Sequence, residues 1–146
     1  MHRLGIPIHY YSVQVGHAQV DHYLMDRLLT RTWTLEIPRA VRSMTKRPDV
    51  LLGLLQEDET LIPRCHPYAW VGRFPLKLSR AVLRPEICDL LPQITRGELE
   101  IPRRIKELAQ EISSVIYVDD NRTNCRIENL RAITTQEVEA SQGVQQ

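Results

Sequence analysis

The stretch YVDDNRTNCRIENLRAIT, residues 117–134, decides how the end of this chain folds. Strand-forming residues lead into it, and the spacing predicts a strand over residues 115–119. Asp119, Asp120 and Asn121 then tolerate the turn and left-handed conformations that a tight reversal of the chain requires. The sequence therefore predicts a strand followed by an ordered polar loop.

Four further polar residues indicate how the loop is held and where the next helix begins. Asn124 and Asn129 are placed to bond backbone groups within the loop. Thr134 and Glu137 have the spacing of a capping box, in which Thr134 caps a helix and Glu137 bonds back. Considered without reference to any known family, the segment is an ordered, hydrogen-bonded connection in an α+β domain.

The same segment resembles the HNH motif (the His-Me finger, or ββα motif) of phage and intron-associated homing endonucleases. The family pattern is approximately V-D/H-H-x-D-G-N-x-x-N-N-x-x-x-N-L-R-x-x-T-x-x-x-N, and this chain reads V-I-Y-V-D-D-N-R-T-N-C-R-I-E-N-L-R-A-I-T-T-Q-E-V. The resemblance is confined mainly to residues 115–138, within a core motif at 113–141. The residues expected to form the motif scaffold are Asp119, Asp120, Asn121, Asn124, Asn129 and Thr134.

The resemblance also shows what this copy of the motif lacks. In the family, a histidine activates water, and its neighbour and a residue near the final helix bind one divalent metal. Here these positions hold Tyr117, Ile116 and Val138, and Asp120 replaces the usual turn glycine. Isoleucine and valine cannot ligate a cation, and a tyrosine with a pKa near 10 is a poor base. We therefore predict no catalytic residue, no metal site and no cofactor.

A weaker similarity lies upstream, in the segment PLKLSRAVL. There Ser79 stands where such proteins often carry a histidine. A predicted helix over residues 102–112 separates this segment from the motif, so the resemblance is interrupted.

One alternative keeps the activity. Asp119, Asp120 and Glu128 offer the oxygen ligands that Mg²⁺ prefers, and His66 or an N-terminal histidine would have to replace the missing base. In this alternative the protein is an active, diverged Mg²⁺-dependent DNA endonuclease.

The charge distribution suggests where a nucleic acid would bind. The chain has a net charge of +1, with 16 arginines among its 19 basic residues. Residues 61–110 carry +4 and residues 111–146 carry −3. Alternation on a predicted strand would place Arg73 and Lys77 on one face, where they suit phosphate contacts, although a solvated strand face is an equal explanation. The predicted nucleic-acid-binding residues are Arg73, Lys77, Arg80, Arg122, Arg126 and Arg131.

Periodicity predicts the remaining elements. The sequence favours a strand over residues 6–15, a helix over residues 18–30, and a strand-prone, proline-punctuated stretch over residues 61–83. The length fits one domain. We predict an α+β fold with a small antiparallel sheet and helices, closing on a degenerate ββα unit. Residues 1–60 would form an N-terminal segment or lobe, and residues 61–146 an HNH-like region.

These patterns predict a catalytically silent, HNH-derived protein of phage or mobile-element type that contacts DNA. The isoelectric point of 7.8 is below the value of about 9 typical of dedicated nucleic-acid binders, which favours the alternative of a regulatory protein that binds a host protein machine. An odd number of cysteines, three, and the lack of an apolar leader or membrane segment predict an intracellular, cytoplasmic protein.

Overall fold

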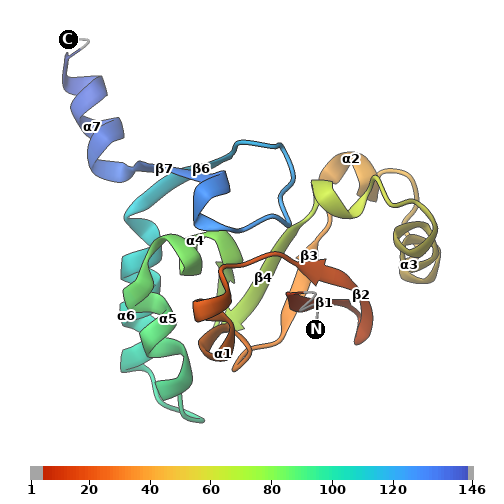
Figure 1. Cartoon of the computed structure of the whole chain (residues 1–146), viewed down its shortest axis with the longest axis horizontal. Helices are drawn as coiled ribbons and strands as arrows, with labels where there is room; N and C mark the ends of the chain where they lie inside the picture. Colours follow the sequence, from red (N-terminus) through yellow and green to blue (C-terminus); the bar gives the residue numbers. More distant parts are fainter. Residues whose placement is uncertain (1–4, 145–146) are drawn as a thin grey trace.

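Strand pairing organises the chain into one five-stranded sheet and one separate hairpin (Figure 1). The computed structural model describes residues 5–144. The strands of the larger sheet are β1 (Ile6–Tyr10), β2 (Val13–Ala18), β3 (Trp33–Glu36), β4 (His66–Val71) and β5 (Phe74–Lys77), in the order β2-β1-β3-β4-β5. The antiparallel hairpin consists of β6 (Ile112–Tyr117) and β7 (Leu130–Thr134).

The predicted α+β fold is confirmed, but the larger sheet is mixed. β1 pairs in parallel with β3, whereas the other neighbours are antiparallel. A parallel pair needs a long crossover, and the chain between β1 and β3 supplies one through β2 and a short helical segment.

Short helices surround the sheet. They are α1 (Met25–Leu28), α2 (Arg39–Arg42), α3 (Pro48–Glu57), α4 (Leu78–Leu83), α5 (Pro85–Leu90), α6 (Glu100–Gln110) and α7 (Thr135–Val144), with 3-10 turns η1 (His22–Leu24), η2 (Ile62–Arg64), η3 (Leu91–Gln93) and η4 (Ile127–Asn129). Figure 1 shows α4, α5 and α6 gathered on one side, α3 at the opposite end, and α7 projecting away from the body. None of the helices between residues 5 and 144 is long and apolar enough to cross a membrane.

The core lies between one face of the sheet and helices α4 to α6. Strand alternation turns Ile6, Ile8 and Leu76 inward, and the apolar faces of the helices cover them. Burying this apolar surface is the main favourable term in folding. The buried helical residues include Leu78, Ala81, Val82, Ile87, Ile105, Leu108 and Ala109.

The predicted helix over residues 18–30 is confirmed only in part, because its first residues belong to β2 and to contacts with the motif loop. Ala18 ends β2, and Gln19 donates its N–H to Thr123 O at 2.8 Å and accepts from Cys125 N at 2.8 Å. These backbone groups are therefore used by the loop and are not free for a helix. The helical segment that does form consists of η1 followed directly by the short α1.

The predicted division at residue 60 falls between α3 and η2. Strand pairing crosses it, because Thr34 in β3 lies opposite Tyr68 in β4. The division into two parts stays a prediction.

The predicted capping box begins α7. Glu137 N donates to Thr134 Oγ1 at 3.1 Å, and Thr134 N donates to Glu137 Oε2 at 3.0 Å. Replacing Thr134 with alanine removes one of these bonds and should cost ~1 kcal/mol. Because α7 projects from the body, we expect local loss of structure, seen as about fivefold faster amide exchange in α7. A Gln136→Ala variant, which changes an exposed residue of the same helix, is the control. Unchanged exchange in Thr134→Ala would contradict the capping role.

Candidate functional site

The polar loop between β6 and β7 is organised around one carboxylate. Asp119 Oδ1 accepts bonds from Asn121 N and Asn129 Nδ2, both at 2.8 Å, and Oδ2 accepts from Asn124 Nδ2 at 2.8 Å. Asp119 N donates to Asn129 Oδ1 at 3.0 Å. The bond from Asn124 is the largest of several that hold the pKa of Asp119 below its usual value. Asp119 is therefore an ionised structural acceptor.

Asn129 is the buried member of this hydrogen-bond network. It is only 6% exposed, and its Nδ2 also donates to Asn124 O at 2.9 Å. Asn121 Oδ1 accepts from Thr123 N at 3.0 Å and from Thr123 Oγ1 at 2.7 Å. Four of the six residues predicted as the scaffold, Asp119, Asn121, Asn124 and Asn129, thus bond to one another across the loop, whereas Asp120 and Thr134 make no hydrogen bond to this network.

The loop is also tied to the N-terminal part of the chain. Cys125 is fully buried, and a bridge joins Gln19 to Asn124. Further bonds run from Ile127 N to Asp21 Oδ2 (2.8 Å) and from Arg122 N to Pro63 O (2.8 Å). The hairpin is consequently fixed against the larger sheet.

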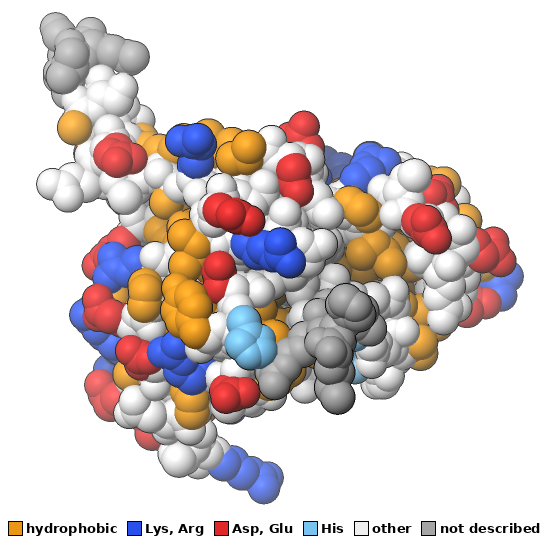
Figure 2. Space-filling model, viewed as in Figure 1, with side chains coloured by type: hydrophobic (Ala, Val, Ile, Leu, Met, Phe, Trp, Pro, Cys, Tyr) orange, Lys and Arg blue, Asp and Glu red, His pale blue; other side chains and the backbone are white. Residues whose placement is uncertain are grey.

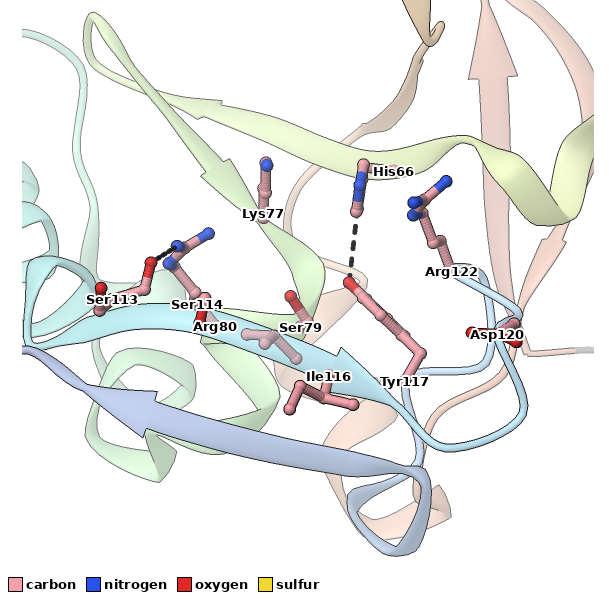
Figure 3. Close-up of a pocket in the computed structure, with 11 residues that line it drawn as sticks. His66, Lys77, Ser79, Arg80, Ser113, Ser114, Ile116, Tyr117, Asp120 and Arg122 are labelled. Atoms are coloured by element: carbon pink, nitrogen blue, oxygen red, sulfur yellow. Dashed lines mark hydrogen bonds between the residues drawn. The ribbon is translucent and has the colours of Figure 1, made fainter. Parts of the chain in front are cut away.

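A cavity of about 440 Å³ opens where the hairpin meets the end of the sheet (Figure 3). We call it the basic pocket; its main side chains are His66, Lys77, Ser79, Arg80, Tyr117, Asp120 and Arg122. The upstream segment with Ser79 forms the end of β5 and α4, so it reaches the motif despite the intervening α5 and α6. The family's histidine position, Tyr117, and its neighbour Ile116 both line this pocket.

Three cations define the electrostatics of the basic pocket. Lys77, Arg80 and Arg122 form no ion pair within the described part of the chain, and Asp120 is the one carboxylate among the lining residues. Asp120 sits at φ 62°, the left-handed conformation that the family's glycine adopts freely and that aspartate tolerates. The cavity therefore attracts anions.

Three of the other basic residues between residues 61 and 110 are neutralised by ion pairs. Arg84, Arg103 and Arg104, beside or on α5 and α6, pair with glutamates. In Figure 2, acidic and basic side chains alternate on the side of the molecule formed by these helices. The positive charge that remains unpaired on β5 and α4 lies at the basic pocket.

The two pocket arginines are held in place by backbone carbonyls. Arg80 donates to Ile112 O at 3.4 Å and to Ser113 O at 3.3 Å. Arg122 Nη1 donates to Arg64 O at 3.0 Å. Each guanidinium has further N–H groups for a ligand.

His66 and Tyr117 face each other inside the pocket. The Tyr117 hydroxyl lies 3.4 Å from His66 Nδ1 and points at it (Figure 3). Burial, followed by Lys77, Arg122 and Arg80, lowers the pKa of His66 to about 4. Burial raises the pKa of Tyr117 to about 12. Both are neutral near pH 7, and the tautomer of His66 determines whether the Tyr117 hydroxyl or the Nδ1–H of His66 is the donor.

Ser79 is the most deeply buried polar group of the pocket. It is 2% exposed, and its Oγ has no hydrogen-bond partner among the described residues. It faces the Tyr117 phenol closely enough to lower that group's pKa, but not with the geometry of a hydrogen bond. A buried hydroxyl without a partner costs free energy, which a ligand oxygen would recover.

The structure separates the other predicted residues from this pocket. Arg73 lies in the β4–β5 turn beside Gly72, so the expected shared strand face with Lys77 is wrong. Arg126 lines a different cavity, and Arg131 is exposed on β7 opposite Ile116. Val138 lies on α7, outside the lining of the basic pocket.

The donor groups do not fit a divalent cation at the position implied by the motif. Ile116 has no donor atom, and both Asp119 oxygens already accept amide hydrogens. Asp120 lines the basic pocket, whereas Glu128 lines another cavity, so the three proposed Mg²⁺ ligands do not converge. Within residues 5–144, no three histidine, cysteine, aspartate or glutamate side chains cluster as a metal site would require.

The lowered pKa of His66 predicts a pH-dependent stability. Between about pH 6.5 and 4 the unfolded chain binds a proton at His66 that the folded chain does not, so stability should fall as the pH falls through this range. We expect a loss of roughly 1–3 kcal/mol, measured by urea unfolding at several pH values. His66→Gln should remove this part of the pH dependence. An identical pH profile in the variant would contradict the burial of a neutral imidazole.

Comparison with known proteins agrees with the position of this site. A family model described as HNH endonuclease matches residues 113–140, which include β6, the polar loop, β7 and the start of α7. No curated protein and no solved structure is significantly similar to the chain. Residues 113–140 therefore carry a partial resemblance to the HNH endonucleases, which indicates a nuclease-related origin for this segment of the chain.

Proposed function

We propose that this protein is a catalytically silent HNH-derived protein that binds DNA by holding a backbone phosphate in the basic pocket. One observation carries the proposal. Where the family has a base and metal ligands, this chain has three cations without ion pairs among the described residues and a buried hydroxyl without a partner. The phage or mobile-element origin rests on the motif resemblance alone.

The side chains of the pocket match the chemistry of a phosphate diester. Arg80 and Arg122 present planar guanidinium groups, and Lys77 adds a point charge. The Ser79 hydroxyl, and His66 in the tautomer protonated at Nε2, are neutral donors for the remaining oxygen lone pairs. Phosphate contacts of this kind position a protein on DNA without reading its sequence.

The same side chains also support the proposed lack of catalytic activity. Hydrolysis of a phosphate diester needs a group that activates water and a group that stabilises the leaving oxygen. Tyr117, with a pKa of about 12, is not ionised near pH 7 and so does not accept a proton, and its hydroxyl is hydrogen-bonded to Nδ1 of His66. The protein therefore binds DNA without cleaving the phosphate diester.

Salt dependence tests the proposal. A labelled DNA duplex is titrated at about 50 mM and about 200 mM salt; neutralising the one phosphate held in the basic pocket predicts an affinity loss of about 3.5-fold. An affinity that does not change with salt, or no binding at either concentration, would overturn the proposal. Either result would favour the alternative that the near-neutral composition suggests, a regulatory protein that binds a host protein.

A further inference from the structure

The face of the large sheet opposite α4 to α6 carries exposed aromatic rings. In β4, Pro67, Ala69 and Val71 point into the core, so His66, Tyr68 and Trp70 lie in a row on the other face. Tyr68 is half-buried and Trp70 is 56% exposed. An exposed tryptophan on an open sheet face is unusual because its burial would be strongly favourable.

These rings border a broad cavity of about 960 Å³. We call it the aromatic groove; it is defined by Tyr11, Tyr68 and Trp70, with Thr34, Glu36 and Arg42 as its main polar lining. The Tyr68 and Trp70 rings stand edge to face, with centroids 5.7 Å apart. With one basic and one acidic side chain in that lining, the groove itself has little net charge.

Tyr11 lines the groove although its backbone conformation is unfavourable for a bulky residue. It lies in the β1–β2 turn at φ 50°, followed by Ser12 at φ 70°, and it is 66% exposed. Left-handed backbone is unfavourable for a bulky residue, and asparagine followed by glycine is preferred in such two-residue turns. Stability alone therefore does not explain a tyrosine at this position.

The aromatic groove and the basic pocket are lined by neighbouring residues of β4 and β5. His66, two residues before Tyr68 on the same face, lines the pocket, and Tyr68 pairs across strands with Lys77. Stacking rings thus lie directly beside phosphate-binding cations. This combination is how proteins hold single-stranded nucleic acid, in which bases stack on aromatic rings and cations contact the backbone.

We infer that the aromatic groove binds unpaired bases of single-stranded nucleic acid whose backbone enters the basic pocket. The backbone part rests on the proposed function, whereas the base-stacking part rests on Tyr11, Tyr68 and Trp70 alone. A duplex, in which bases are already stacked, would use only the basic pocket.

Tryptophan fluorescence can read this binding at a single residue. The chain has two tryptophans, and Trp33 is 1% exposed with its Nε1 bonded to Leu28 O. Quenching by a ligand therefore reports Trp70. Titration with oligothymidylate and oligouridylate of about 12 nucleotides should quench saturably, whereas a duplex of similar length should not. The two oligomers distinguish DNA from RNA.

Variants assign the binding to the groove. Affinities for labelled oligomers should fall about tenfold or more in Trp70→Ala and in Tyr68→Ala. Tyr23→Ala removes a tyrosine that is 65% exposed and does not line the groove, and should bind like the wild type. Replacing Tyr11-Ser12 with Asn-Gly should raise the melting temperature and still weaken binding. Weaker binding in this more stable variant would be due to the lost contact of Tyr11 with the ligand and not to unfolding.

The outcomes separate the two proposals. Loss of oligomer binding in Trp70→Ala and Tyr68→Ala, with wild-type binding in Tyr23→Ala, supports the aromatic groove whatever the duplex result. If both groove variants bind oligomers normally while a Lys77 variant weakens duplex binding, the inference is overturned and the proposed function stands. Failure of all oligomers and duplexes to bind overturns both.

Discussion

Replacing Asn129 with alanine should lower the free energy of unfolding by about 3 kcal/mol, which is about 6–12 °C in melting temperature. The side chain is buried and serves Asp119 N, Asp119 Oδ1 and Asn124 O at once. Its removal leaves a backbone N–H and a carbonyl without their partners, and each lost partner costs about 1–3 kcal/mol when the group is buried.

Urea unfolding followed by circular dichroism measures this change. Arg131→Ala is the control, because Arg131 is exposed on the adjacent strand and makes no side-chain hydrogen bond within the described residues. We expect the control to differ from the wild type by less than about 0.5 kcal/mol. A similarly small change in Asn129→Ala would show that the loop is not held by this network.

Reversing the charge of Lys77 should weaken binding to duplex DNA by roughly 30- to 150-fold at low salt. Lys77→Glu removes one attraction to the phosphate and adds one repulsion, together about 2–3 kcal/mol at a partly exposed site. Arg80 and Arg122 also brace backbone carbonyls, so Lys77 is the pocket cation whose replacement least disturbs the fold.

Two variants make this test specific, with fluorescence anisotropy as the readout. Lys106→Glu introduces the same charge change on an exposed lysine of α6 and should alter affinity only slightly. Asp120→Asn removes the carboxylate from the pocket lining and should tighten binding. Equal losses in the two lysine variants would mean that net charge, rather than the basic pocket, governs the interaction.

Local signals predicted the motif region well. Thr134 and Glu137 form the capping box, and the asparagines bond within the loop, because these interactions join residues close in sequence. The α6 helix was also predictable from the spacing of its apolar residues, since its buried face is set by helical geometry.

Interactions between distant segments were not predictable in this way. Gln19 was predicted to be helical, but its backbone bonds to the motif loop, more than a hundred residues later in the sequence. The segment around Ser79 was expected to stay a strand, but it turns into α4 so that Leu78 and Val82 enter the core. Local periodicity does not contain these tertiary contacts.

The residues that make up the site were also only partly predictable from the sequence. Of the six predicted nucleic-acid-binding residues, the fold brings Lys77, Arg80 and Arg122 into one pocket. His66 lies fifty-one residues before Tyr117, and only the folding of β4 beside the hairpin brings the two together. The alternation of His66, Tyr68 and Trp70 was the signal in the sequence that could have placed them on one open face.

The most direct test of the central claim is to measure DNA binding and DNA cleavage in the same reaction. Labelled duplex is incubated with the wild-type protein, with Mg²⁺ or Mn²⁺ and without either, and with the Lys77→Glu variant in parallel. We expect salt-sensitive binding that Lys77→Glu weakens, and intact DNA under all conditions. Metal-dependent cleavage that disappears in Asp119→Ala or Asp120→Ala would contradict it, because the motif would then have kept its reaction.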